Sequence, residues 1–274
     1  MLNARFAVLS ILGALALFIG MLLFMEIGRR YGIKKSRLHG EAARVGVGAV
    51  DSAVYSLLAL LIGFAFSGAA GRFDKRREMV SHQVNAISTA WDRIDLLAPA
   101  QQPPVRADVR GFLDALLAAY DNPAGSREEK SARRTLGTVQ DRLWANVIGF
   151  SMTPDGEKAR VLIIPSINEM FDAVDEERMA QRVHPPTLIY VMLVITALAA
   201  ALFAGYGMAT SERRNWLLMV GAAGTVSIAM FVTLELESAR QGWIRIDAMN
   251  DVLHELRTEL KDPPPALRPS AALR

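Results

Sequence analysis

Four long apolar stretches dominate the hydropathy pattern of this chain. A helix needs about 20 apolar residues to cross a hydrocarbon core about 30 Å thick, and each stretch reaches that length. We therefore predict four transmembrane helices. The predicted spans are residues 6–27, 47–71, 187–209 and 215–235.

The spans form two pairs, and a charged segment of more than a hundred residues separates the pairs. No alternating strand pattern competes with the helical periodicity, so the fold class predicted is an all-α integral membrane protein. The predicted organisation is a transmembrane pair in 1–71, a helical aqueous domain in 72–184, a second pair in 185–236, a C-terminal amphipathic helix in 237–262 and a disordered Pro/Ala-rich tail in 263–274.

The second span continues into the charged segment without a helix stop before Pro99. Apolar residues recur there at helical spacings, at Phe73, Val80, Val84, Ile87, Trp91 and Ile94. This pattern predicts one long helix with its first half in lipid and its second half in water. Further amphipathic patterns predict helices near 105–120, 136–150 and 162–174, and Pro165 should kink or delay the last of them.

Two spans carry small residues at four-residue spacing. The second span has Gly63, Ser67 and Gly71, and the third has Ala197, Ala201 and Gly205. Small side chains at this spacing let helix backbones approach closely in lipid. We expect them to pack helices within one chain, and contact between subunits is the alternative.

Another face of the second span carries larger apolar residues, namely Ile62, Phe66, Ala69 and Phe73. If several copies of this helix surrounded an axis, the stripe would form an apolar constriction that gates by dewetting. A stripe that faces lipid or the protein core is the alternative interpretation.

Composition supports the membrane assignment. The 274 residues are 51% hydrophobic, which is high for a soluble domain. The formal net charge is only +3, and the basic residues lie beside the spans, where they serve as topology signals or contact anionic lipid. We therefore expect a lipid bilayer as the partner and no nucleic acid.

The positive-inside rule does not fix the orientation. Residues 28–44 contain six Lys and Arg residues, but the second span ends in a further basic cluster at Arg72–Arg77, on the opposite face of the membrane. The two clusters therefore give opposite answers.

Catalytic and metal-binding motifs are lacking. The chain has no cysteine, which excludes disulfides and thiolate ligands, and its four histidines lie far apart in the sequence. We therefore predict no enzyme activity, no metal and no cofactor. The ionisable residues at the span ends, Asp51, Glu235 and Glu237, are expected to be solvated by headgroups and water.

The segment GFAFSGAAGRFDKRR at residues 63–77 resembles the bestrophin-like domain family of bacterial and plant membrane proteins. Similar segments follow up to about residue 260, and Gln83 stands where the family usually has Glu. The matching motif residues are Arg72, Arg77, Asn85, Thr89, Arg93, Asp95, Asn168, His184, Pro185 and Glu235.

More distantly, the motif resembles true bestrophins, which are pentameric anion channels whose second transmembrane helix lines an apolar neck and continues into a cytosolic helical domain. The resemblance implies a homo-oligomeric ion channel, with a pentamer as the expected assembly, in a bacterial inner membrane with the aqueous domain in the cytoplasm. The pore candidates are Ile62, Phe66, Ala69 and Phe73. The alternative is a non-conducting anchor or scaffold whose aqueous domain binds a partner protein.

Overall fold

A computed structural model describes residues 2–39, 47–123, 125–180, 185–210, 214–237 and 247–261. All regular elements in these ranges are helical, which confirms the all-α prediction. The α-helices are α1 (Leu2–His39), α2 (Val47–Arg93), α3 (Gln102–Asp121), α4 (Arg127–Ser151), α5 (Glu157–Ala180), α6 (Thr187–Gly207), α7 (Trp216–Glu237) and α8 (Asp247–Glu259). Short 3₁₀ helices are η2 (Ile94–Leu96), η3 (Pro154–Gly156) and η4 (Met208–Thr210).

Four of these helices, α1, α2, α6 and α7, are long and apolar enough to cross a membrane, as predicted. The chain divides into two compact units, and each consists of two separate stretches of sequence. The membrane unit comprises Met1–Lys75 and Val183–Arg245, and the aqueous unit comprises Arg76–Arg182 and Ile246–Arg274. The predicted tail at 263–274 and the motif residue His184 lie outside the described residues.

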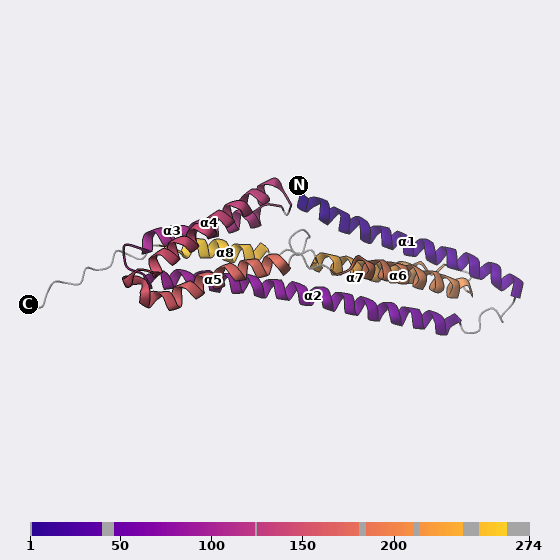
Figure 1. The fold of residues 1–274 in the computed structure, drawn as a ribbon. Helices are drawn as coiled ribbons and strands as arrows, with labels where there is room; N and C mark the ends of the chain where they lie inside the picture. The colour runs from indigo at the N-terminus through magenta and orange to yellow at the C-terminus, as the bar shows by residue number, and fades with distance from the viewer. Residues whose placement is uncertain are drawn as a thin grey trace, which may run out of the picture. The chain divides into compact units, whose positions relative to one another are not determined.

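Within the membrane unit, α1 lies alongside α6 and α7 (Figure 1). Glycines make the contact between α1 and α6 close. A Cβ built at Gly205 would overlap the carbonyl oxygen of Met25, and one built at Gly28 would overlap that of Leu202. Because van der Waals packing replaces the hydrophobic drive in lipid, this backbone-to-backbone approach holds the two helices together.

The aqueous unit has an extended hydrophobic core built by α3, α4, α5, α8 and the second half of α2. The largest side chains in it, such as Phe112, Leu143 and Ile163, have no exposed area. Figure 1 shows α3 and α4 running side by side, and α8 packs against α3. Burial of these apolar stripes drives the folding of the unit.

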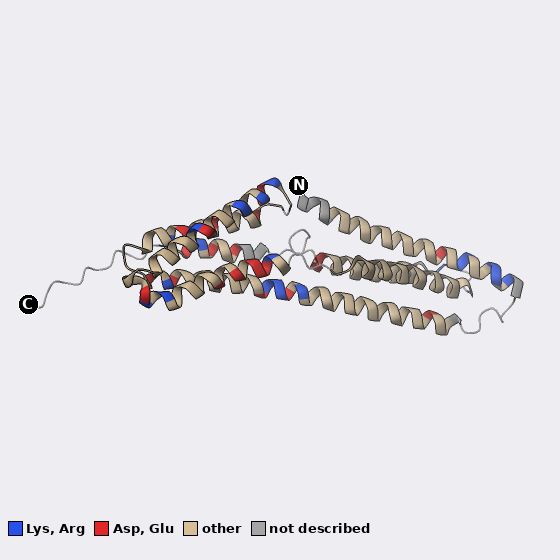
Figure 2. Cartoon of the chain, viewed as in Figure 1, with Lys and Arg blue, Asp and Glu red and all other residues tan. Residues whose placement is uncertain are grey.

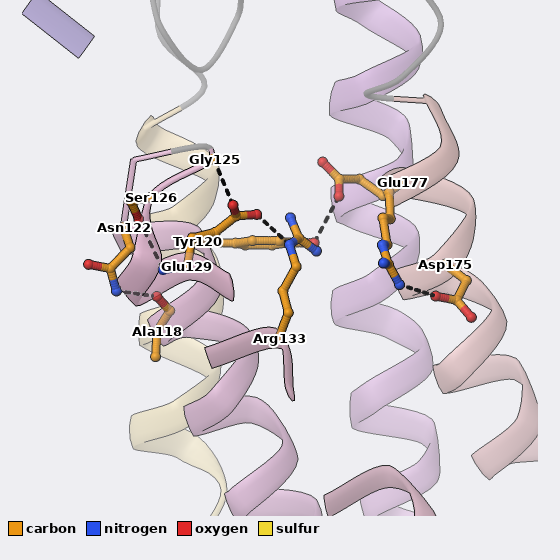
Figure 3. Close-up of polar contacts among 10 residues, drawn as sticks. Ala118, Tyr120, Asn122, Gly125, Ser126, Glu129, Arg133, Asp175 and Glu177 are labelled. Carbon is orange, nitrogen blue, oxygen red and sulfur yellow. Dashed lines mark hydrogen bonds and ion pairs between the residues drawn. The ribbon is translucent and has the colours of Figure 1, made fainter. Parts of the chain in front are cut away.

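The start of α4 is fixed by local hydrogen bonds (Figure 3). The backbone N–H of Glu129 donates to Ser126 Oγ at 3.0 Å, and the Glu129 carboxylate accepts from the backbone N–H of Gly125 at 2.7 Å. These contacts satisfy N–H groups that have no partner within the helix. Gly125 has φ of 80°, a conformation that favours glycine.

Pro165 lies inside α5 and does not delay it, so the expectation of a delayed start is wrong: the helix begins at Glu157. Proline removes its own N–H, which would have bonded to the carbonyl of Val161 one turn earlier. The Val161 side chain is 73% exposed, so water has access to this turn. Arg93 Nη1 also donates to the neighbouring carbonyl of Leu162 at 3.1 Å.

In the region of the predicted C-terminal helix at 237–262, the described part of the chain contains the end of α7 at Glu237 and α8 over Asp247–Glu259. In α8, Arg257 Nε donates to Asp114 Oδ1 of α3 at 2.5 Å, and Leu253 is buried in the core. The hydrogen bond with Asp114 raises the pKa of Arg257, so the guanidinium stays charged.

Candidate functional site

Helix α2 is the least covered of the four membrane-spanning helices. Only 11% of its most apolar window is buried, against 22% for α1 and 33% for each of α6 and α7. One face of α2 packs on the membrane unit through Leu58 and Ala69, which are 2% and 0% exposed. The rest of the helix surface is available to lipid or to other copies of the chain.

The side of α2 opposite this packing face carries Leu60, Phe64, Ser67 and Gly71, which we call the outer face of α2. Their spacings of four, three and four residues place them on one side of a helix. Leu60 is 54% exposed and Phe64 is 67% exposed, and Ser67 and Gly71 are also exposed. The outer face is therefore uncovered along about three turns.

The predicted pore stripe lies on the other side of α2, where the chain itself covers part of it. Ala69 has no exposed area, and Ile62 packs partly against the core of the membrane unit. Phe66 is 43% exposed and Phe73 is half-buried. Helical periodicity identified a set of residues that share a face, but it could not show that the chain's own helices cover part of that face.

The two predicted small-residue stripes have different surroundings. In α6, Ala197 and Ala201 have no exposed area, and Gly205 meets the backbone of α1 at Met25. In α2, a Cβ built at Gly63 or Gly71 finds no described atom within 4 Å. The expected packing within one chain is thus not seen at the α2 stripe.

An ion pair joins the end of the membrane half of α2 to α7. Arg72 donates to the Glu237 carboxylate from Nη2 at 2.7 Å and from Nε at 2.9 Å, both to Oε2. The Glu237 side chain is only 8% exposed. Two charge-assisted hydrogen bonds from one guanidinium fix this end of α2 against α7.

Glu235 lies two residues earlier on α7 and is fully buried, with no exposed area. Its carboxylate accepts a hydrogen bond from Ser10 Oγ of α1 at 2.5 Å. The expectation that headgroups and water solvate Glu235 is therefore wrong. The reason is that α1 covers the last turn of α7, which the sequence alone did not show.

The family-motif residues of the aqueous unit divide into exposed and contacting groups. Arg77, Asn85 and Thr89 are exposed on α2. Asp95, after the end of α2, pairs with Arg106 of α3, whose guanidinium lies 4.5 Å from the ring centre of Trp91. This cation–π contact and ion pair stabilise the turn between α2 and α3.

The remaining motif residues lie on α5, before α6 and at the end of α2. Asn168 is exposed on α5 and donates to Asp172 Oδ2 at 3.4 Å, and Pro185 is partly exposed before α6. Arg93 contacts the α5 backbone as described above. The structure thus does not bring the motif residues together into one cluster.

Gln83, where the family usually has Glu, is fully buried in the aqueous unit. Its amide donates to the carbonyl oxygen of Ala173 at 3.2 Å. The Tyr120 hydroxyl lies 3.1 Å from Gln83 Oε1 and 3.0 Å from Glu177 Oε2, and Figure 3 shows the contact between Tyr120 and Glu177. This network connects α2, α3 and α5 through the core, so its role here is structural.

No group of three or more His, Asp or Glu side chains that could hold a metal ion occurs in the part of the chain that the structure describes. The notable features are therefore the outer face of α2 and the ion pair at the end of its membrane half. An uncovered helix face of this kind suits either the lining of a path through the membrane or packing against another helix.

Comparison with known proteins shows the family of this chain. A family model for the Bestrophin-like domain matches residues 34–268. The chain belongs to the Bestrophin-like domain family. No curated protein matches the chain.

Among solved structures, bestrophin homologues from Klebsiella pneumoniae share the fold. One variant has a TM-score of 0.67 at 13% identity, with 88% of this chain and 98% of that chain covered. A second variant has a TM-score of 0.65 at 12% identity, with 89% and 99% covered. A third structure, solved by Zn-SAD phasing, has a TM-score of 0.64 at 13% identity, with 88% and 97% covered. At these identities the likeness establishes the fold of this Bestrophin-like protein.

Sequence reasoning missed Leu60 and Phe64 of the outer face and the pairing of Arg72 with Glu237. The signal for the first two was available: both share the face of Ser67 and Gly71. The ion pair joins residues 165 positions apart, and nothing in the sequence specified that partner.

Proposed function

We propose that this Bestrophin-like protein is an oligomeric ion channel in which α2 of each copy lines the conduction path. The observation that supports this proposal best is the uncovered outer face of α2. A membrane helix with a long unpacked face needs either lipid or other protein to cover it, and the small residues on this face allow close approach.

The chemistry of the outer face suits a neck. Leu60 and Phe64 would form an apolar constriction when several copies surround an axis, and such constrictions control conduction by dewetting. Ser67 and Gly71 follow towards the aqueous end, where small side chains leave a wider path. Phe66, at the edge of the exposed surface, would contribute less than Phe64.

The family resemblance supports a pentamer in a bacterial inner membrane. Because four spans bring the chain back to the side where it started, both parts of the aqueous unit lie on one side of the membrane, and we assign this side to the cytoplasm. The basic cluster at the end of α2 fits this orientation under the positive-inside rule, whereas the cluster at residues 28–44 then lies on the opposite side, against that rule.

The test combines oligomeric state with conduction. We expect the protein in mild detergent to form one defined oligomer, measured by light scattering, and to give unitary currents in planar bilayers. Phe64→Ala should change the unitary current more than Phe66→Ala, because Phe64 lies on the outer face. A monomer that stays silent under voltage and salt gradients would overturn the proposal.

A second candidate function is a non-conducting scaffold. It is favoured by exposed apolar side chains on the aqueous unit: Val161 and Leu162 of α5 are 73% and 47% exposed, and Leu96 of η2 is 47% exposed. Such side chains suit contact with a partner protein. This candidate predicts that Val161→Asp abolishes capture of one stoichiometric partner and that the reconstituted protein carries no current.

A further inference from the structure

Helix α1 is longer than a membrane crossing requires. Its 38 residues extend about 57 Å, against a hydrocarbon core of about 30 Å. The last part of the helix is basic, with Arg30, Lys34, Lys35 and Arg37 after the apolar region, and Figure 2 shows this change from tan to blue along α1. The only acidic residue in 23–37 is Glu26.

Three of these basic residues continue the apolar surface of α1. Ile19, Leu23 and Ile27 are 48%, 57% and 54% exposed, and apolar side chains exposed on a membrane helix suit contact with lipid. Arg30, Lys34 and Arg37 are exposed and follow Ile27 at spacings of three, four and three residues. These spacings keep them on the same side of the helix as the apolar residues. We call these three residues the basic line of α1.

The basic line is held on a firmly packed helix. A Cβ built at Gly32 would lie 2.7 Å from the Cβ of Ala209 and 2.9 Å from the carbonyl oxygen of Tyr206, so α1 remains in close contact beyond its apolar part. Glu26 Oε1 accepts hydrogen bonds from both Arg30 and Arg214 at 2.9 Å. One carboxylate therefore faces two guanidinium groups, which leaves this end of the membrane unit positively charged.

Aromatic side chains occur at the same end of the unit. Tyr31 of α1 is 60% exposed, and its ring centre lies 6.2 Å from that of Tyr206. Trp216, the first residue of α7, is 56% exposed. Exposed Tyr and Trp at the end of a span are typical of the membrane–water interface.

We infer that the basic line of α1 binds the phosphate groups of anionic phospholipids in the adjacent leaflet. Arg30 lies about 4.5 Å and Lys34 about 10 Å beyond Ile27 along the helix, which is the depth of the headgroup layer. Arg37 lies further out, and its long side chain reaches back towards the headgroups. Because the three side chains point to the lipid side, their charge complements that of anionic headgroups, and each adds to the attraction. This inference does not depend on conduction.

The experiment counts bound lipids by native mass spectrometry. The full-length protein is reconstituted in vesicles of equal phosphatidylglycerol and phosphatidylcholine, extracted in mild detergent and analysed. We expect the wild-type protein to retain phosphatidylglycerol in preference to phosphatidylcholine. The triple variant R30Q/K34Q/R37Q should lose this preference, by roughly fivefold for each charge removed.

The matched control removes the same charge elsewhere. The variant R127Q/K130Q/R134Q neutralises three exposed basic residues of α4 in the aqueous unit and should retain phosphatidylglycerol as the wild type does. The charge-conserving variant R30K/K34R/R37K should also retain it, which separates loss of charge from loss of folding. Three results would each overturn the inference: no lipid preference in the wild type, an unchanged preference in R30Q/K34Q/R37Q, or an equal loss in the α4 control.

Discussion

Two stripes of small residues, one on α6 and one on α2, share the same spacing but not the same surroundings. The α6 stripe is Ala197, Ala201 and Gly205, and the α2 stripe is Gly63, Ser67 and Gly71. The backbone of α1 fills the space over the α6 stripe, whereas no described atom lies near the Cβ positions of Gly63 and Gly71. The spacing thus shows that another helix can pack closely on the stripe. Only the structure shows whether a helix of the same chain does so.

The largest effect is expected from filling the α6 stripe. Gly205→Ala places a methyl group on the carbonyl oxygen of Met25, and neither backbone can move without separating α1 from α6. We expect a loss of about 1–3 kcal/mol or more in the free energy of unfolding. Denaturant titration in detergent, followed by circular dichroism, measures it.

The matched control for Gly205→Ala is Gly221→Ala. Gly221 is an exposed glycine of α7 whose Cβ position has no described atom within 4 Å. An equal loss of stability in both variants would show that the close contact between α1 and α6 has no special importance.

The next largest effect on stability is expected from the ion pair that holds α2, because the small-residue stripe of α2 is not packed. Arg72→Gln removes the hydrogen bonds from the guanidinium to the buried Glu237 carboxylate and leaves that carboxylate without them. We expect a loss of about 1–3 kcal/mol in the free energy of unfolding, since the partner is largely buried.

A double-mutant cycle with Glu237→Gln isolates the interaction between the two side chains. Additive effects of Arg72→Gln and Glu237→Gln would contradict a direct role of this pair in holding α2.

The smallest effect on stability is expected at the α2 stripe. Gly63→Ala should leave the free energy of unfolding of the subunit unchanged or raise it by up to about 1 kcal/mol, because alanine favours the helix and the added methyl group meets nothing. Its effect should instead fall on assembly, seen as a shift in the oligomer distribution by light scattering.

Gly221→Ala serves again as the control for Gly63→Ala, because it should stabilise its helix equally and leave the oligomer unchanged. If both variants give the same oligomer distribution as the wild type, the α2 stripe has no part in assembly.

The sequence predicted the helices well because each carries a strong periodic signal. The continuity of α2 from Val47 to Arg93 followed from the apolar spacing and the lack of a stop before Pro99. Four spans and a helical aqueous unit followed from hydropathy alone. Local rules were less reliable at Pro165, which lies inside α5 with the turn at Val161 exposed.

The candidate site was predictable only in part. Periodicity along α2 defines several faces, but it does not show that the chain itself covers Ala69, which lies with Leu58 on the packing face. Pairings between distant residues, such as Ser10 with Glu235, depend on how α1 and α7 meet in space. Spacing within one helix carries no information about such partners.

The central claim is that the outer face of α2 lines the conduction path. Because this chain has no cysteine, the most direct test introduces single cysteines that no native thiol can obscure. Ser67→Cys on the outer face of α2 and Ala201→Cys in the buried α6 stripe are compared during planar-bilayer recording while a charged methanethiosulfonate reagent is added. The account predicts that the reagent reduces the current of Ser67→Cys and leaves that of Ala201→Cys unchanged. A Ser67→Cys channel that conducts normally throughout the treatment would contradict a conduction path lined by the outer face of α2.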